Sequence, residues 1–144
     1  MVLTQFSTQM LWPMVAMAGL TIVAWMIMGR RRLGAIAAGR VPIDDFKGDK
    51  DPGLPGAAAI ATRHFGNHFE VPVLFHVVCL LHIVFGVGGP FAAALAWGFV
   101  AFRALHTWEH LGRNDVPWRF RFYASSTLIV WVLWVELAVR IAIA

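Results

Sequence analysis

A cation, an amide and a carboxylate recur along one stretch of the sequence at positions i, i+4 and i+7. They are Arg63, Asn67 and Glu70. With 3.6 residues per helical turn, this spacing predicts that the three side chains share one helical face. A guanidinium binds carboxylates, a carboxylate binds ammonium groups, and an amide both donates and accepts hydrogen bonds. The stretch therefore offers three recognition chemistries at one place.

A second polar stripe follows about forty residues later. Arg103, His106 and His110 have i, i+3 and i+7 spacing, and Arg119 and Tyr123 are i, i+4 neighbours just after it. We expect the second stripe at the same level as the first, which concentrates arginines in one region.

Taken together, the arginines in this region exceed the carboxylates of Glu70 and Glu109 that could neutralise them. This imbalance predicts an anionic ligand or an anionic lipid headgroup, and a small molecule with carboxylates suits the fork of a guanidinium. Taken singly, each residue has a structural alternative: an ion pair between helices, or an arginine that reaches the lipid headgroups.

The histidines raise the question of a metal. His64 with His68, and His106 with His110, have the i, i+4 spacing of two ligands on one helix. Nearby arginines repel a cation, and the sequence has no duplicated Glu-x-x-His pair of the di-iron type. We therefore expect no metal, although a metal- or haem-binding redox bundle is a third reading of the six histidines.

Polar residues in the remaining apolar stretches have structural interpretations. We expect His76 and His82 to hydrogen-bond to a neighbouring helix, and Cys79 to pack in the interior. Glu136 and Arg140 are i, i+4 neighbours in the favourable order for a structural ion pair.

The elements that position these side chains must lie in a membrane. The chain has 144 residues, of which 59% are hydrophobic and 14% charged, and a mean hydropathy of +0.67. Soluble domains carry about 25% charged residues, and a single domain of this length cannot bury so much apolar surface. We predict an all-α integral membrane four-helix bundle, formed as one domain by residues 1–144.

Four spans account for the apolar segments. Residues 10–28 form the first, and residues 71–95 are divided by the turn signal Gly86-Val87-Gly88-Gly89-Pro90 into the second span and the start of the third. The third span runs over residues 90–111, with Gly112 as its C-terminal cap, and the fourth from Pro117 to residue 142. Residues 30–55 form a polar linker outside the bilayer.

The basic residues predict the orientation of the bundle. Seven lie between Arg30 and Arg63, four between Arg103 and Arg121, and one, Arg140, at the opposite end. The positive-inside rule then predicts a cytoplasmic site, with the N-terminus, the glycine-rich turn and the C-terminus on the other side.

These motifs resemble the MAPEG family, membrane-associated proteins in eicosanoid and glutathione metabolism. The resemblance rests on Arg63-x3-Asn67-x2-Glu70-x-Pro72, on Arg103-x2-His106-x3-His110, and on Gly112-x4-Pro117-x-Arg119. The spacing is most similar to the branch of microsomal prostaglandin E synthase and microsomal glutathione transferase.

The resemblance implies a homotrimer that binds glutathione as co-substrate between subunits, near the cytoplasmic side. It implies a transferase or peroxidase that acts on hydrophobic electrophiles from the lipid. Arg119 would be catalytic and would stabilise the glutathione thiolate. The implied glutathione-binding residues are Arg31, Arg63, Asn67, Glu70, Arg103, His106, His110 and Tyr123.

Two residues differ from what the resemblance leads one to expect. His110 stands where related members often have a tyrosine, and Phe120 stands where the prostaglandin branch has a serine. The expected reaction is therefore glutathione transfer or peroxide reduction rather than prostaglandin synthesis. The alternative is a non-catalytic protein of the same fold that binds anionic lipid or a partner protein.

Overall fold

The computed structural model describes residues 5–47 and 53–143, and within these ranges it is helical with no β-strand. Residues 48–52 of the expected polar linker, and residues 1–4, lie outside the described ranges. The long helices are α1 (Gln5–Ala37), α2 (Gly56–Gly66), α3 (Val71–Phe85), α4 (Pro90–Leu111) and α5 (Val116–Ala142). Two short 3-10 helices, η1 (Ile43–Lys47) and η2 (Asn67–Phe69), lie between them.

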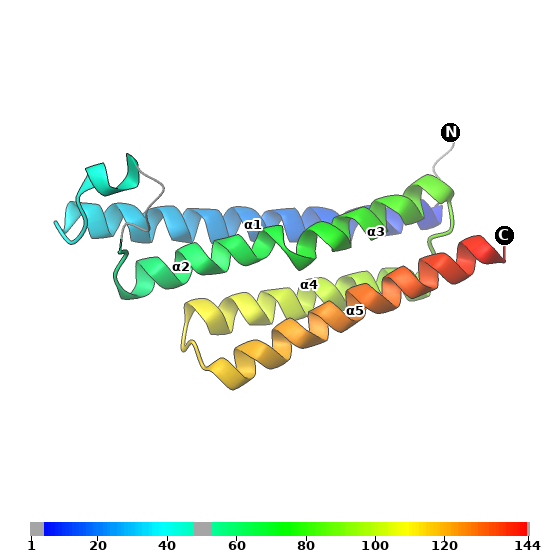
Figure 1. The fold of residues 1–144 in the computed structure, drawn as a ribbon. Coiled ribbons are helices and arrows are strands. Elements are labelled where there is room, and N and C mark those ends of the chain that lie inside the picture. The colour runs from blue at the N-terminus through cyan, green and yellow to red at the C-terminus, as the bar shows by residue number, and fades with distance from the viewer. Residues whose placement is uncertain (1–4, 48–52, 144) are drawn as a thin grey trace.

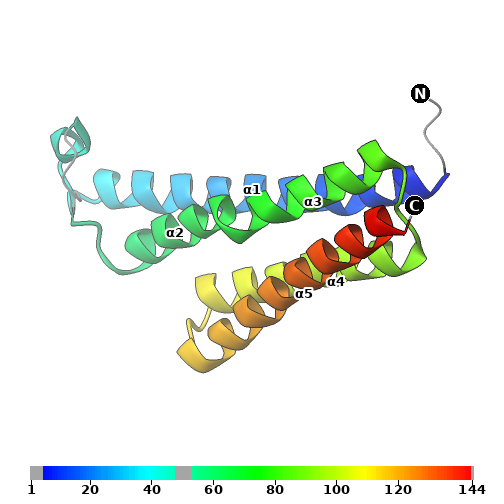
Figure 2. The ribbon, with the colours of Figure 1, turned by 45° about the vertical axis from the view of Figure 1, so that its right-hand side comes forward.

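The helices form four roughly parallel rods, because α2 and α3 continue one another along α1 (Figure 1). Helices α4 and α5 pair as a hairpin beside them, and the two views agree on this arrangement (Figure 2). Both basic segments lie at one end of the bundle. The start of α1, the end of α5 and the turn between α3 and α4 lie at the other end.

The core changes from apolar to polar along the bundle. The buried stripe of α4 begins with Ala92, Ala96 and Phe99 and continues with Arg103, His106 and His110. In the apolar half, the Phe99 ring stacks on that of Phe75, with 4.2 Å between ring centroids. The polar half coincides with the basic end of the molecule, so Arg103, His106 and His110 of the second predicted stripe are inside the bundle.

Helix α1 is longer than the predicted span of residues 10–28. Its 33 residues are roughly 50 Å long at 1.5 Å per residue, more than the hydrocarbon core of a bilayer. Arg31 therefore lies on a helix rather than in a linker. Residues 30–37 include alanine, leucine and arginine, which favour helix, and the first break is the left-handed Gly39, with a φ of 65°.

The second rod, which consists of α2, η2 and α3, is interrupted in the region of Arg63, Asn67 and Glu70. One continuous helical face was predicted there. Helix α2 ends at Gly66, η2 follows, and Glu70 has φ −101° and ψ −108°, outside the helical region. Pro72 explains the break, because it lacks an N–H donor and its ring clashes with the carbonyl four residues earlier. The prediction that one continuous helix carries all three residues was therefore wrong.

The two predicted turns are confirmed. Gly86 caps α3 in the left-handed conformation, with a φ of 67°, and Pro90 is the first residue of α4. At Gly112, which caps α4, a Cβ atom would lie 2.8 Å from the backbone oxygen of Trp108. A side chain does not fit there, so this position requires glycine.

Among the described residues, three segments are long and apolar enough to cross a membrane: residues 8–37, residues 56–85 and α5. Helix α4 carries Arg103 and two buried histidines, which lower its hydropathy, although it packs along α5 inside the bundle. Together with the long apolar helices, this arrangement describes an integral membrane protein.

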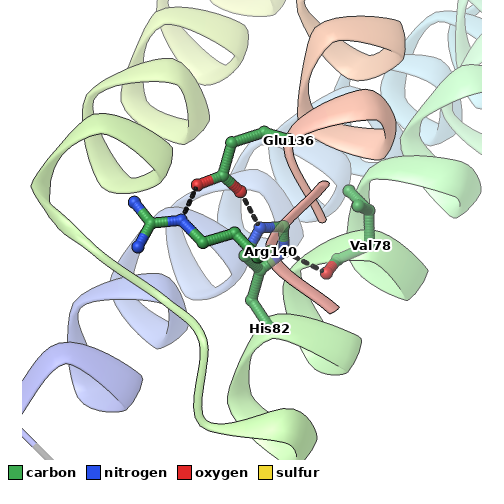
Figure 3. Close-up of polar contacts among 4 residues, drawn as sticks. All are labelled: Val78, His82, Glu136 and Arg140. Carbon is green, nitrogen blue, oxygen red and sulfur yellow. Dashed lines mark hydrogen bonds and ion pairs between the residues drawn. The ribbon is translucent and has the colours of Figure 1, made fainter. Parts of the chain in front are cut away.

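Figure 3 shows a polar cluster that joins α3 to α5 near the C-terminal ends of both helices. Glu136 Oε2 lies 2.6 Å from His82 Nε2, and Glu136 Oε1 accepts a hydrogen bond from Arg140 Nε at 2.7 Å. The second ring nitrogen of His82 lies 2.7 Å from the Val78 carbonyl. The predicted structural roles of His82 and of the Glu136–Arg140 pair are confirmed.

Candidate functional site

A cavity of about 420 Å³ opens at the basic end, between the second rod and the α4–α5 hairpin. It unites most of the side chains that spacing singled out, although they come from separate elements. Its lining consists of Arg63, Asn67, Glu70, His106, His110, Val116, Arg119, Phe120 and Tyr123. Every predicted site residue except Arg31 and Arg103 is in this lining.

The carboxylate of Glu70 faces the hairpin across the cavity. It accepts a hydrogen bond of 3.3 Å from the hydroxyl of Tyr123 on α5. The break before α3 therefore does not separate Glu70 from the other site residues. The contact ties the second rod to α5 at the cavity wall.

Arg103 lies behind the cavity lining and has no exposed surface. Its Nη2 donates to the carbonyl of Asn67 at 2.7 Å, and its guanidinium lies 5.5 Å from the centre of the Tyr123 ring. Within the described chain, its Nε and Nη1 atoms are buried without a hydrogen-bond partner. A buried cation with unused donors makes this region strongly favourable for an anion.

Arg119 is positioned by the turn between α4 and α5. The side chain of Asp115 accepts a hydrogen bond from the Trp118 N–H at 3.1 Å and caps α5, as short polar side chains do at helix starts. Arg119 lies in the first turn of this helix, and its Nη1 donates to Asn114 Oδ1 at 2.5 Å. The cap thus orients a guanidinium at the cavity.

Arg31 lies apart from the other predicted site residues within one chain. It donates to the carbonyls of Leu111, at 2.9 Å, and Ala57, at 3.4 Å. It lines a separate hollow of about 140 Å³ beside α2.

Four buried histidines pack next to the cavity, two from the second rod and two from α4. His64 Nδ1 lies 3.1 Å from His110 Nδ1, and His64 Nε2 lies 3.2 Å from His68 Nε2. His68 Nδ1 in turn lies 3.0 Å from the hydroxyl of Thr21 on α1. Spacing indicated two pairs, each on one helix, whereas the structure joins both pairs and adds a threonine.

The cavity also contains residues that spacing did not indicate. Val116 and Phe120 add an apolar wall beside Arg119. The resemblance to the MAPEG family had singled out Phe120, whereas nothing in the sequence distinguished Val116 from the other apolar residues of the chain. Spacing likewise did not group Thr21 with His64 and His68, because Thr21 lies far from these histidines in the sequence.

Comparison with known proteins agrees with this architecture. The model of the MAPEG family matches residues 10–139, so the chain belongs to the MAPEG family, which includes glutathione transferases and peroxidases. No curated protein and no solved structure matched the chain in the corresponding comparisons.

Proposed function

We propose that the protein is an integral membrane glutathione-dependent transferase or peroxidase. The observation that carries this proposal is the cavity itself, in which two arginines, an amide, a carboxylate and a tyrosine converge. Glutathione carries two carboxylates, one ammonium group, amides and a thiol. Arginines suit its carboxylates, Glu70 its ammonium group and Asn67 its amides.

Arg119 acts on the thiol in this proposal. A free thiol has a pKa near 8.5 and is mostly protonated at neutral pH, whereas the nucleophile is the thiolate. A guanidinium in a cavity with restricted water favours the thiolate, because it stabilises the negative charge that forms on sulfur. The thiolate then attacks a hydrophobic electrophile, which reaches the apolar wall of Val116 and Phe120 from the lipid.

A homotrimer completes the site in this proposal. Arg31 makes its hydrogen bonds outside the cavity of its own chain, and it is half-buried on a helix that lies along the second rod. A neighbouring subunit could therefore place its Arg31 near a bound glutathione molecule. The remaining apolar surface contacts lipid or adjacent subunits.

The test is a titration of detergent-solubilised protein with glutathione, followed by the ultraviolet absorbance of the thiolate. We expect saturable thiolate formation, its loss in Arg119→Ala, and its retention in Arg121→Ala. Arg121 is a matched control, because it lies two residues further on α5, is exposed, and stacks over Trp118 instead of lining the cavity.

Two negative outcomes of this titration would contradict different parts of the proposal. Glutathione that binds without forming thiolate would contradict the role of Arg119 and leave a binding protein. Absence of saturable binding would contradict the glutathione proposal and favour an anionic lipid headgroup as the ligand of these arginines.

A further inference from the structure

The structure assigns a transition-metal site to His64, His106 and His110, with zinc as the ion that three imidazoles suit best. One ring nitrogen from each histidine lies within 4.8 Å of the other two, and all three side chains are buried. Zinc binds imidazole nitrogens at about 2.0–2.1 Å, so two nitrogens of one tetrahedral site lie roughly 3.3 Å apart. The His64–His110 nitrogen pair, at 3.1 Å, is already close to that separation.

His106 is prepared to act as a ligand by its hydrogen bond. Its Nδ1 lies 3.0 Å from the backbone oxygen of Arg119, which can only accept, so Nδ1 carries the proton. In the neutral ring, Nε2 then has a free lone pair. That Nε2 is buried and has no hydrogen-bond partner in the part of the chain that the structure describes. A backbone carbonyl that holds the non-ligating nitrogen is the usual outer support of a metal-binding histidine.

A chain of hydrogen bonds prepares His64 in the same way. The hydroxyl of Thr21 donates to the Met17 carbonyl at 3.1 Å, so its oxygen accepts from His68 Nδ1. His68 Nε2 must then accept, and the proton of that contact belongs to His64 Nε2. This leaves the lone pair of His64 on Nδ1.

His110 supplies the third nitrogen after a change of tautomer. Its Nδ1 can donate to His64 Nδ1 in the ion-free protein. When the metal binds, the proton of His110 moves to its Nε2, and Nδ1 becomes a ligand. Because His106 and His110 line the cavity, the fourth coordination position faces the cavity and is open to water or an anion.

The positive charges of the arginines around the cavity repel a divalent cation, so they should lower the affinity of the site for metal. Arg63 and Arg119 line the same cavity, and Arg103 lies one turn before His106 on α4. The three imidazoles are neutral and do not offset that charge. Replacing Arg119 with glutamine should therefore tighten metal binding, whereas the same residue is required for thiolate formation in the proposed function.

The experiment is a Co²⁺ titration of the detergent-solubilised protein, purified without a polyhistidine tag and without glutathione. Four-coordinate cobalt gives an intense visible absorption, and Zn²⁺ should abolish it by competition. We expect one ion per chain and a loss of affinity of at least about 100-fold in His106→Gln. Thr21→Val should weaken binding about 10-fold, because supporting groups of this kind contribute 10- to 100-fold.

His76→Gln is the matched control, because His76 lies on α3 outside the cluster, 2.7 Å from the Pro72 carbonyl. Far-ultraviolet circular dichroism and the elution volume establish that each variant is folded. If His106→Gln does not fold, Thr21→Val still tests the assignment. Equal cobalt affinity in wild type, Thr21→Val and folded His106→Gln, or no stoichiometric binding by wild type, would overturn it. Either result is independent of glutathione binding.

Discussion

At the scale of single residues, Arg103 and Gly112 are two buried or crowded positions with different physical constraints. Arg103 is fully buried, yet only its Nη2 has a hydrogen-bond partner in the described structure. Leaving donors unused inside a protein is unfavourable unless a ligand or water satisfies them. The unpartnered donors of Arg103 therefore do not favour the stability of the helix bundle.

Gly112 illustrates the opposite case, a residue required by geometry alone. We expect Gly112→Ala to lower the free energy of unfolding by about 1–3 kcal/mol, because its Cβ would lie 2.8 Å from the Trp108 backbone oxygen. Thermal unfolding in detergent measures the change. Gly34→Ala is the control: it lies in α1 with no atom within 4 Å of the added Cβ. That substitution should stabilise by about 0.5–1 kcal/mol. Equal effects of the two substitutions would contradict this account.

At the scale of elements, the break between α2 and α3 decides how the site is formed. A continuous helix would place Glu70 on one stripe with Arg63, and the proline two residues later prevents this. Glu70 nevertheless reaches Tyr123 across the cavity, through a hydrogen bond of 3.3 Å. The site thus depends on packing between elements more than on one helical face.

The contact between α3 and α5 gives a prediction of its own. Glu136→Ala removes the hydrogen-bond partner of the fully buried His82 Nε2, so we expect a loss of about 1–3 kcal/mol in the free energy of unfolding. Arg140→Ala should cost less than about 1 kcal/mol, because the Arg140 side chain is 43% exposed. Chemical or thermal unfolding of both variants in detergent makes the comparison. A larger effect of Arg140→Ala would show that His82 is not the residue that depends on Glu136.

At the scale of the whole molecule, the surface and the core are arranged for a bilayer. Large apolar side chains such as Trp12, Trp25 and Leu128 are more than half exposed, whereas the basic core residues are buried. Lipid is the solvent that makes such a surface favourable. Both basic segments lie at the same end, so one orientation satisfies the positive-inside rule for the entire bundle.

That orientation can be measured with single cysteines in a Cys79→Ser background. A cysteine at the exposed Arg113, in the α4–α5 turn, should react with a membrane-impermeant maleimide only from the cytoplasmic side. One at Gly88, in the α3–α4 turn, should react only from the opposite side. Intact cells and inverted vesicles provide the two accessible faces. The reverse pattern would invert the orientation and place the cavity outside the cytoplasm.

The sequence by itself determined the membrane class, the long helices and their turns, since apolar length, glycine and proline act locally. The ends of α1, and the break after Gly66, depended on whether nearby residues continued a helix, so they differed from the predictions. Spacing also identified the two cavity residues of α4, His106 and His110, because residues on one buried stripe of a helix must face the same neighbours.

Only the tertiary structure decided which polar stripes on different helices contact one another. His64 contacts His110 across 46 positions, and Thr21 reaches His68 across 47, and no periodicity within a helix encodes either contact. Arg31 was likewise indistinguishable in sequence from a residue of the cavity. The physical reason is that a helix fixes the face on which a side chain lies, whereas packing in three dimensions determines what that face touches.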